Sequence, residues 1–172
     1  AHRHLARETT SAPGRWSTAR TPYLREPMDA LSARSGIREV VMMTGSKIGK
    51  SECALNFVGY SIEHAPGPMM LVLPTAGVAE LWAQQRFAPT IEVTAVLDEL
   101  VNKRGANNTV ARKKFPGGVL AIAGANSSAD LRSTPIRDLI LDEVDAFPLD
   151  LDGQGDPVEL ARRRTDNFRG KL

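Results

Sequence analysis

The chain has 172 residues, of which 42% are hydrophobic and 24% charged, and its net charge at neutral pH is +2. These values are ordinary for one soluble globular domain. The single cysteine, Cys53, excludes an intrachain disulfide and argues against a cysteine-based metal cluster. No apolar run approaches the roughly 18 residues of a membrane span, and residues 1–16 lack the apolar core of a secretory signal. The sequence therefore predicts a cytosolic protein without a membrane partner.

The basic residues are unevenly distributed along the chain. Between positions 101 and 137 one acid, Asp130, accompanies a group of basic residues: Lys103, Arg104, Arg112, Lys113, Lys114, Arg132 and Arg137. A second basic group closes the sequence: Arg162, Arg163, Arg164, Arg169 and Lys171. Such groups can neutralise the phosphates of a nucleic acid, although an ordinary solvated surface accounts for them as well.

The N-terminal part divides into a polar arm and the start of the domain. Residues 1–20 are rich in Arg, Ser and Thr and have little to bury, so we expect an arm, with the domain proper over residues 21–172. The stretch TPYLREPMDAL (21–31) begins with Thr21 as a plausible helix cap and Pro22 at the first helical position. Pro27 interrupts any single helix there.

The next three elements alternate between strand and helix. The short apolar run EVVMM (39–43) predicts a buried strand. Residues 51–64 place Leu55, Val58 and Ile62 on one helical face, and the APGP sequence that follows ends the helix. The run MMLVLP (69–74) predicts a second buried strand.

The remaining elements continue the alternation. Residues 75–87 and 89–103 each predict a helix, and residues 108–125 predict a hairpin around 116–118. The stretch RDLILDEVDAFP (137–148) predicts a third apolar strand that ends in acids, and residues 155–168 predict a helix capped by Asp156. Strands that alternate with helices predict an α/β domain with a mostly parallel central sheet flanked by helices. The order of the strands in the sheet does not follow from the pattern.

One short stretch has the features of a phosphate-binding loop. The usual motif is G-x-x-x-x-G-K-[ST], and the stretch Thr44–Glu52 (TGSKIGKSE) matches its second half at Gly49-Lys50-Ser51. Its first half departs from the motif, because Thr44 occupies the place of the first glycine. A strand before the loop and a helix after it would give phosphates unpaired N–H groups and a helix dipole. The alternative is a structural strand–turn–helix join.

The nucleotide-binding candidates in this loop are its nine residues: Thr44, Gly45, Ser46, Lys47, Ile48, Gly49, Lys50, Ser51 and Glu52. Within the motif, Lys50 would reach the outer phosphates of ATP, and the Ser51 hydroxyl would bind Mg²⁺.

A pair of acids strengthens the case for a nucleotide site. Asp142 and Glu143 follow the apolar run 139–141, so a strand would deliver Asp142 to the sheet edge at which open α/β sheets bind ligands. There Asp142 would contact Mg²⁺, and Glu143 could polarise a water molecule. Two acids after a strand are more often a solvated turn. Together with the loop, however, they predict Mg²⁺-dependent nucleotide hydrolysis.

These stretches also resemble a known family, the ATPase domain of bacteriophage terminase large subunits of the lambda-like GpA type. The resemblance lies in residues 21–31, 49–75, 113–137, 139–148 and 155–168, with FPGG, GANSSADLRS and LDEVDAFP as its most specific strings. It implies an additional-strand P-loop fold and ATP hydrolysis that drives double-stranded DNA into an empty capsid.

The resemblance also implies roles for single residues. Lys50 and Ser51 match the loop lysine and the Mg²⁺-binding hydroxyl, Asp142 the Mg²⁺-associated acid and Glu143 the catalytic base. Lys47 could stabilise charge on the γ-phosphate, with a solvated loop lysine as the alternative.

Three further residues have two interpretations each. Tyr23 falls in a segment that resembles an adenine-contacting region, so its ring could stack on the base or belong to the core as a half-buried Tyr. Arg132 and Arg137 could sense phosphate or touch DNA, although packing at helix edges is the plainer interpretation.

The resemblance implies partners as well: double-stranded DNA, a small terminase subunit and a portal, in a homo-oligomeric ring in the host cell cytoplasm. The nuclease domain of the family has no counterpart here, so we expect an ATPase fragment without DNA-cutting activity. Two alternatives remain at this stage, a helicase-like P-loop ATPase of another superfamily and a non-catalytic fragment that binds DNA or a partner.

Overall fold

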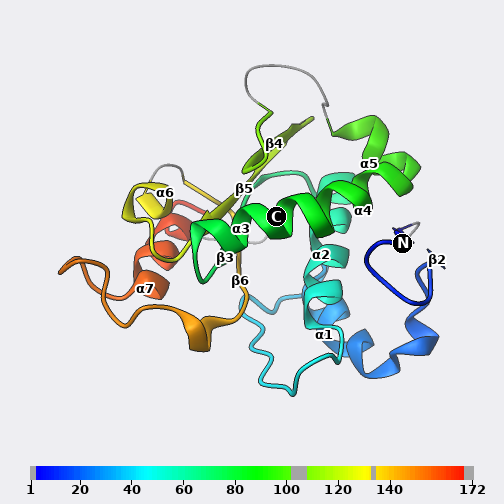
Figure 1. Cartoon of the computed structure of the whole chain (residues 1–172), viewed down its shortest axis with the longest axis horizontal. Coiled ribbons are helices and arrows are strands. Elements are labelled where there is room, and N and C mark those ends of the chain that lie inside the picture. The colour runs from blue at the N-terminus through cyan, green and yellow to red at the C-terminus, as the bar shows by residue number, and fades with distance from the viewer. Residues whose placement is uncertain (1–2, 102–107, 133–134, 169–172) are drawn as a thin grey trace.

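A four-stranded sheet forms the centre of the computed structural model, which describes residues 3–101, 108–132 and 135–168. The sheet order is β4 (Arg112–Phe115), β5 (Gly118–Gly124), β3 (Pro68–Leu73) and β6 (Asp138–Leu141). β3 pairs in parallel with both β5 and β6, whereas β4 pairs antiparallel with β5 at one edge. The fold is therefore mixed α/β with a mostly parallel sheet, as the sequence predicts (Figure 1).

The core has two halves, one on each face of the sheet, because successive side chains of a strand point to opposite faces. All residues of β3 from Met69 to Leu73 are buried, as expected for a central strand that is covered on both sides. Met69, Leu71 and Leu73 join the larger hydrophobic cluster, and Met70 and Val72 join the smaller one.

Different helices cover the two faces. The larger cluster packs under α2 (Lys50–His64), α3 (Ala76–Trp82), a π-helical segment (Ala83–Phe87), α4 (Ala88–Val93) and α5 (Ala95–Leu100). The smaller cluster packs under α6 (Ser128–Arg132) and α7 (Pro157–Arg162), which is followed by a 3₁₀ turn (Arg163–Thr165). Figure 1 shows α6 and α7 grouped together, away from α2, α4 and α5. Among the described residues, no helix has the length and apolar character needed to cross a bilayer.

The N-terminal residues are attached to the domain. A two-stranded ribbon of β1 (His4–Leu5) and β2 (Gly14–Arg15) leads through 3₁₀ turns (Thr18–Arg20 and Pro22–Leu24) into α1 (Arg25–Ala30). Although residues 3–20 are polar overall, Arg3 and Ala6 are buried. The backbone N–H of His4 donates to the Thr94 hydroxyl at 3.1 Å.

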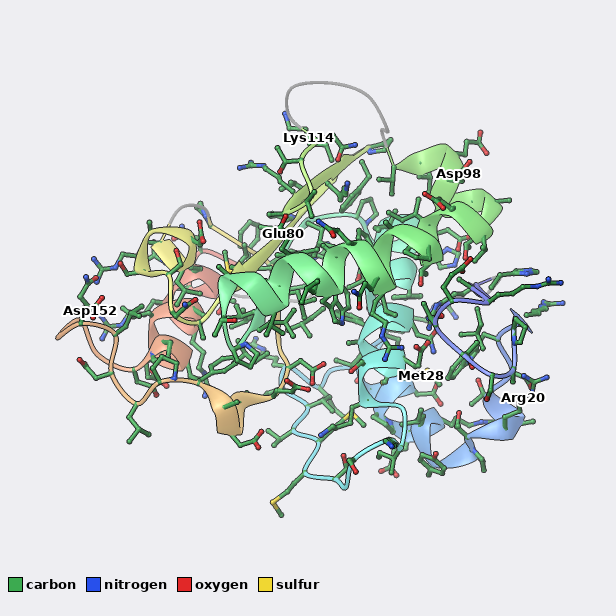
Figure 2. All side chains as sticks on the ribbon, viewed as in Figure 1. Arg20, Met28, Glu80, Asp98, Lys114 and Asp152 are labelled. Carbon is green, nitrogen blue, oxygen red and sulfur yellow. The ribbon has the colours of Figure 1, made fainter. Side chains whose placement is uncertain are left out.

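The next helix, α1, packs beside α2. The Asn56 amide of α2 contacts the Met28 sulfur at 3.3 Å, and Met28 lies against the first turns of that helix (Figure 2). Pro22 begins a helical segment as expected, but Thr21 makes no side-chain capping bond there. The N-terminal residues and α1 together thus cover one side of α2.

Several local predictions are confirmed. Pro116 and Gly117 form the turn between β4 and β5, with Gly117 at a φ of +78°, where glycine is favoured. Asp156 caps α7 by accepting a hydrogen bond from the N–H of Val158 at 2.9 Å. The two helices expected over 75–87 and 89–103 are instead the succession of α3, the π-helical segment, α4 and α5.

The prediction of a buried strand over residues 39–43 is wrong in this structure. The segment forms no strand, and the side chains of Val41 and Met43 are 80% and 96% exposed. Glu39 instead makes an exposed ion pair with Arg162 of α7 at 2.8 Å. An apolar run becomes a strand only where its backbone groups find a partner, and this one pairs with no described strand.

Candidate nucleotide-binding site

The candidate loop enters α2 through a left-handed turn. Lys47 has a φ of 60°, Gly49 has a φ of 96°, and α2 begins at Lys50. A side chain at Gly49 would be strained by this φ, and its Cβ would come within 3.2 Å of the Leu24 side chain. The glycine of the motif is therefore required by the backbone and by the close approach of Leu24.

The segment before α1 also contacts the loop. The hydroxyl of Tyr23 donates a hydrogen bond to the carbonyl oxygen of Ile48 at 3.0 Å. The Tyr23 side chain is 57% exposed, so it is not a half-buried core residue. Its ring is accessible beside the loop, while Leu24 next to it is buried.

Ser51 and Asp142 are brought together across 91 residues of sequence. The Ser51 hydroxyl, in the first turn of α2, donates to Asp142 Oδ2 at 3.0 Å, and both residues are half-buried. Asp142 follows β6 directly, and its N–H continues the pairing with β3 by donating to the Val72 carbonyl at 3.1 Å. The juxtaposition that the two motifs predict is therefore present at the carboxyl edge of the sheet.

Glu143 stands next to this pair in a rare backbone conformation. Its φ of 57° is in the left-handed region, which costs a non-glycine residue about 1–2 kcal/mol. Its N–H donates to Asp142 Oδ1 at 3.1 Å, and its side chain is exposed. The turn thus aligns Asp142 through the backbone and leaves the Glu143 carboxylate open to solvent.

The remaining loop residues are mostly exposed. Thr44, Gly45, Ser46 and Lys47 are exposed, and Ile48 and Lys50 are half-buried. Within the described part of the chain, no ion pair links Lys47 or Lys50 to Asp142 or Glu143. Their ammonium groups are therefore not neutralised by the acids at the strand end.

Glu52 faces away from the loop. Its carboxylate binds the Arg3 guanidinium, and it lies 3.5 Å from Nη1 of Arg86 in the π-helical segment. Burial lowers the pKa of Arg3, and the neighbouring Glu52 partly offsets this effect. Arg3 and Arg86 were not predicted from the sequence, since no local pattern connects them to a residue 49 or 34 positions away.

The two arginines with open interpretations lie elsewhere. Arg137 precedes β6, at the end of that strand opposite to Asp142, and its guanidinium binds Asp138 at 2.8 Å and the Pro66 carbonyl at 3.1 Å. The carbonyl of Arg132 in α6 accepts a bond from Arg164 at 3.2 Å. The contacts of the Arg137 guanidinium agree with packing, whereas the Arg132 side chain is exposed and its role stays a prediction. Of the two basic groups, Lys103, Arg104, Arg169 and Lys171 lie outside the described residues.

The site thus combines a glycine turn at a helix N-terminus, a hydroxyl and a carboxylate at a sheet edge. Helix N-termini attract anions, and hydroxyl and carboxylate oxygens are suited to a hard cation such as Mg²⁺. This combination in an α/β protein is suited to a phosphate group with its counter-cation.

Comparison with known proteins identifies the family. The profile described as "Phage terminase large subunit gpA, ATPase domain" matches residues 10–172. The chain therefore belongs to the family of phage terminase large subunit ATPase domains of the gpA type.

Two curated relatives carry the same description. The chain is 29% identical over 170 residues to "Terminase, large subunit" of Escherichia phage lambda, and 27% identical over 169 residues to that of Enterobacteria phage P21. Each match covers 96% of this chain but only 26% of the relative, so the chain spans about a quarter of their length. No solved structure matches the chain.

Proposed function

We propose that this chain binds ATP with Mg²⁺ at the loop 44–52 and hydrolyses it as part of a viral DNA-packaging motor. The hydrogen bond between Ser51 and Asp142 is the observation that carries the proposal, because it joins the two motifs of a nucleotide site across the sheet. The family supports it, since its matching profile is that of an ATPase domain.

The oxygens present at the site fit Mg²⁺. The Ser51 hydroxyl and the Asp142 carboxylate offer the hard ligands that this ion takes together with water and phosphate oxygens. When bound, the cation would neutralise phosphate charge. Ser51 and Asp142 would hold it, Asp142 directly or through water.

The remaining candidates would act on the phosphates and on water. Lys50 would bind the β- and γ-phosphates from the first position of α2, and the loop N–H groups would add to this. The exposed carboxylate of Glu143 would orient the attacking water and accept its proton. Lys47, which is exposed on the same turn, would stabilise charge that develops on the γ-phosphate.

The proposed fold is a P-loop domain of the additional-strand type. This fold requires a strand before the loop, and residues 39–43 are the candidate. β6 pairs with β3 on one side and with no described strand on the other, so an edge is open next to Asp142. Glu39 of this segment contacts Arg162 of α7 through an exposed ion pair.

At the level of the whole protein, we propose translocation of double-stranded DNA into a procapsid. The partners would be DNA, a portal and a small terminase subunit, with several copies in a ring in the host cell cytoplasm. We propose no nuclease activity for these residues. The family match favours this function over a helicase of another superfamily and over a non-catalytic fragment.

Two substitutions test the ATPase. Lys50→Ala should abolish ATP binding and turnover because the phosphate charge loses its cation, whereas Glu143→Gln should keep binding and lower turnover by about a thousandfold. ATP binding is measured by calorimetry and phosphate release in a coupled assay, with and without duplex DNA. Lys114→Ala, on the distant strand β4, is the matched control for a lost lysine. An unchanged rate in Lys50→Ala would refute the assignment.

A further inference from the structure

We propose that Glu52 is a positioning residue for the nucleotide site and that it acts through a clasp made of Arg3, Glu52 and Arg86. The clasp ties the N-terminal segment and the π-helical segment to the first turn of α2, and so holds Lys50 and Ser51 in place. This inference rests on the proposed function, because it concerns the same site. It adds Arg3 and Arg86, which lie outside the phosphate loop and its acids, and it gives the loop residue Glu52 a role other than contact with the nucleotide.

Glu52 is placed so that it can orient the loop helix without touching a nucleotide. Successive residues of an α-helix point about 100° apart, so when Ser51 faces Asp142, Glu52 faces another side of α2. There its side chain is 19% exposed and faces the N-terminal segment. Glu52 is separated from Lys50 by one residue, and any shift of its backbone is transmitted directly to the loop.

Arg3 makes the main contact of the clasp. Its side chain is 4% exposed, and its guanidinium binds the Glu52 carboxylate, the Glu52 carbonyl oxygen at 3.1 Å and Asn56 Oδ1 at 2.8 Å. It also lies over the ring of Trp16, 5.8 Å from the ring centroid. Arg3 thus binds both the side chain and the backbone of the first turns of α2.

Burial makes this contact hard to replace. A guanidinium that is buried without a counter-charge is strongly unfavourable, so removing Glu52 would leave Arg3 uncompensated. Breaking the pair from either side should therefore release the N-terminal segment from the helix. A solvent-exposed ion pair would have no comparable effect.

Arg86 adds a second attachment from the other side. Its Nη1 atom lies 3.5 Å from Glu52 Oε1 and donates to the Thr9 carbonyl at 3.3 Å, so it bridges the N-terminal segment and α2. Arg86 belongs to the π-helical segment, and such segments occur frequently at functional sites. Its side chain is 42% exposed, so we expect a smaller contribution from Arg86 than from Arg3.

The clasp matters for ATP because phosphate binding depends on precise placement. A displaced ammonium or N–H group loses part of a charge-assisted hydrogen bond to phosphate, which weakens ATP binding. Within the proposed site, the loop is held by Tyr23 and Leu24 on one side and by the clasp through Glu52 on another. Loss of the clasp should loosen the first turn of α2 while the sheet remains intact.

The test compares Glu52→Gln, Arg3→Ala and Arg3→Lys with Glu63→Gln as the control. Glu63 is on the same helix, is about as exposed as Glu52 at 22%, and contacts His64 at the far end. We expect Glu52→Gln and Arg3→Ala each to raise KM for ATP about tenfold with kcat nearly unchanged, and Arg3→Lys to retain part of the affinity. A smaller folded fraction would instead lower kcat and leave KM unchanged.

Two further measurements decide the outcome. The double variant Arg3→Ala with Glu52→Gln should lose no more than the worse single variant, since both remove one contact. Hydrogen exchange of the amides of residues 53–56, the first ones bonded within α2, should accelerate in these variants, but not in Glu63→Gln, while β3 stays protected. Additive losses, or parental KM together with parental exchange, would overturn the proposal. If the parent and Lys50→Ala are alike in failing to bind ATP, the proposed function fails, and the exchange data alone decide on the clasp.

Discussion

At the scale of single residues, Tyr23 shows how contacts refine a role suggested by resemblance. Its ring is exposed beside the loop, where it could meet a base, and its hydroxyl is bonded to the Ile48 carbonyl. The ring and the hydroxyl have separable effects, because one substitution removes only the hydroxyl. The two interpretations can therefore be weighed by experiment.

We predict that Tyr23→Phe raises KM for ATP roughly threefold, because a partly exposed hydrogen bond contributes about 0.5–1 kcal/mol to holding the loop. Tyr23→Ala should raise KM further, since it also removes a ring that could stack on adenine. Steady-state kinetics with ATP and with GTP measure both effects. Tyr60→Phe is the control, because Tyr60 lies on α2 and its hydroxyl accepts a hydrogen bond from the N–H of Ala33 instead of contacting the loop. Equal KM values for Tyr23→Phe and the parent would show that the hydroxyl does not hold the loop.

The candidate site could be anticipated from sequence only where its residues lie in short local patterns. Gly49 and Ser51 belong to one motif, and Asp142 follows an apolar run that must be a strand, so their meeting follows from the geometry of parallel sheets. Arg3 and Arg86 belong to no such pattern. Their contact with Glu52 depends on how the N-terminal segment packs, which is a tertiary effect.

At the scale of elements, the strands with uninterrupted apolar runs were the most predictable. β3 and β6 have apolar runs bounded by turn residues, and the Pro116-Gly117 turn identifies the β4–β5 hairpin. The same reasoning failed for residues 39–43. Their composition is that of a strand, but the segment has no strand partner among the described residues. Composition indicates that a segment can be buried, but not which sheet edge is available to it.

We predict that residues 39–43 become a strand and lose exposure when ATP is bound. Val41 and Met43 would lose most of their exposure, a favourable change of roughly 25 cal/mol per Å² of apolar area. Hydrogen exchange of the amides of 39–43 should slow on addition of ATP and Mg²⁺. Exchange in the loop at 149–155 serves as an internal reference. In Lys50→Ala, exchange of the amides of 39–43 should not change on addition of ATP. Unaltered exchange at saturating ATP would contradict the prediction.

At the scale of the whole molecule, the reactivity of the Cys53 thiol can report separation of α2 from the sheet and unfolding of the chain. It is the only cysteine of the chain, it is buried in the first turn of α2, and burial raises the pKa of its thiol. Both burial and a raised pKa suppress the reactive thiolate. A thiol reagent can therefore modify the protein only when α2 separates from the sheet or the chain unfolds.

We predict that alkylation of Cys53 is slow in the native protein, fast in urea, and slower still with ATP, since a bound ligand stabilises by about 2.7 kcal/mol at a hundredfold excess over Kd. Mass spectrometry of the alkylated fraction over time measures the rate. Free cysteine at the same pH gives the intrinsic rate of the reagent. Native labelling as fast as labelling in urea would be inconsistent with the buried position.

The same thiol links stability to pH. The pKa of the Cys53 thiol is higher in the folded protein than in the unfolded chain, so the thiol contributes to the free energy of unfolding. This contribution is fully present below the pKa of the unfolded chain and is lost as the pH rises through the pKa of the folded protein. The free energy of unfolding should fall more steeply at alkaline pH in the parent than in Cys53→Ala. Urea titrations across the alkaline range measure this difference. Parallel pH curves for the two proteins would exclude the effect.

The hydrogen bond between Ser51 and Asp142 has a thermodynamic consequence for cation entry. The Ser51 hydroxyl has one proton and two lone pairs, so it can go on donating to Asp142 while a lone pair faces a metal ion. The carboxylate thereby fixes the rotation of the hydroxyl before the cation arrives, and this contact need not be broken. Because Mg²⁺ usually keeps several waters and takes phosphate oxygens as ligands, most of the attraction should come from the negatively charged phosphates that accompany it. Cation and nucleotide would then enter as one unit rather than in succession.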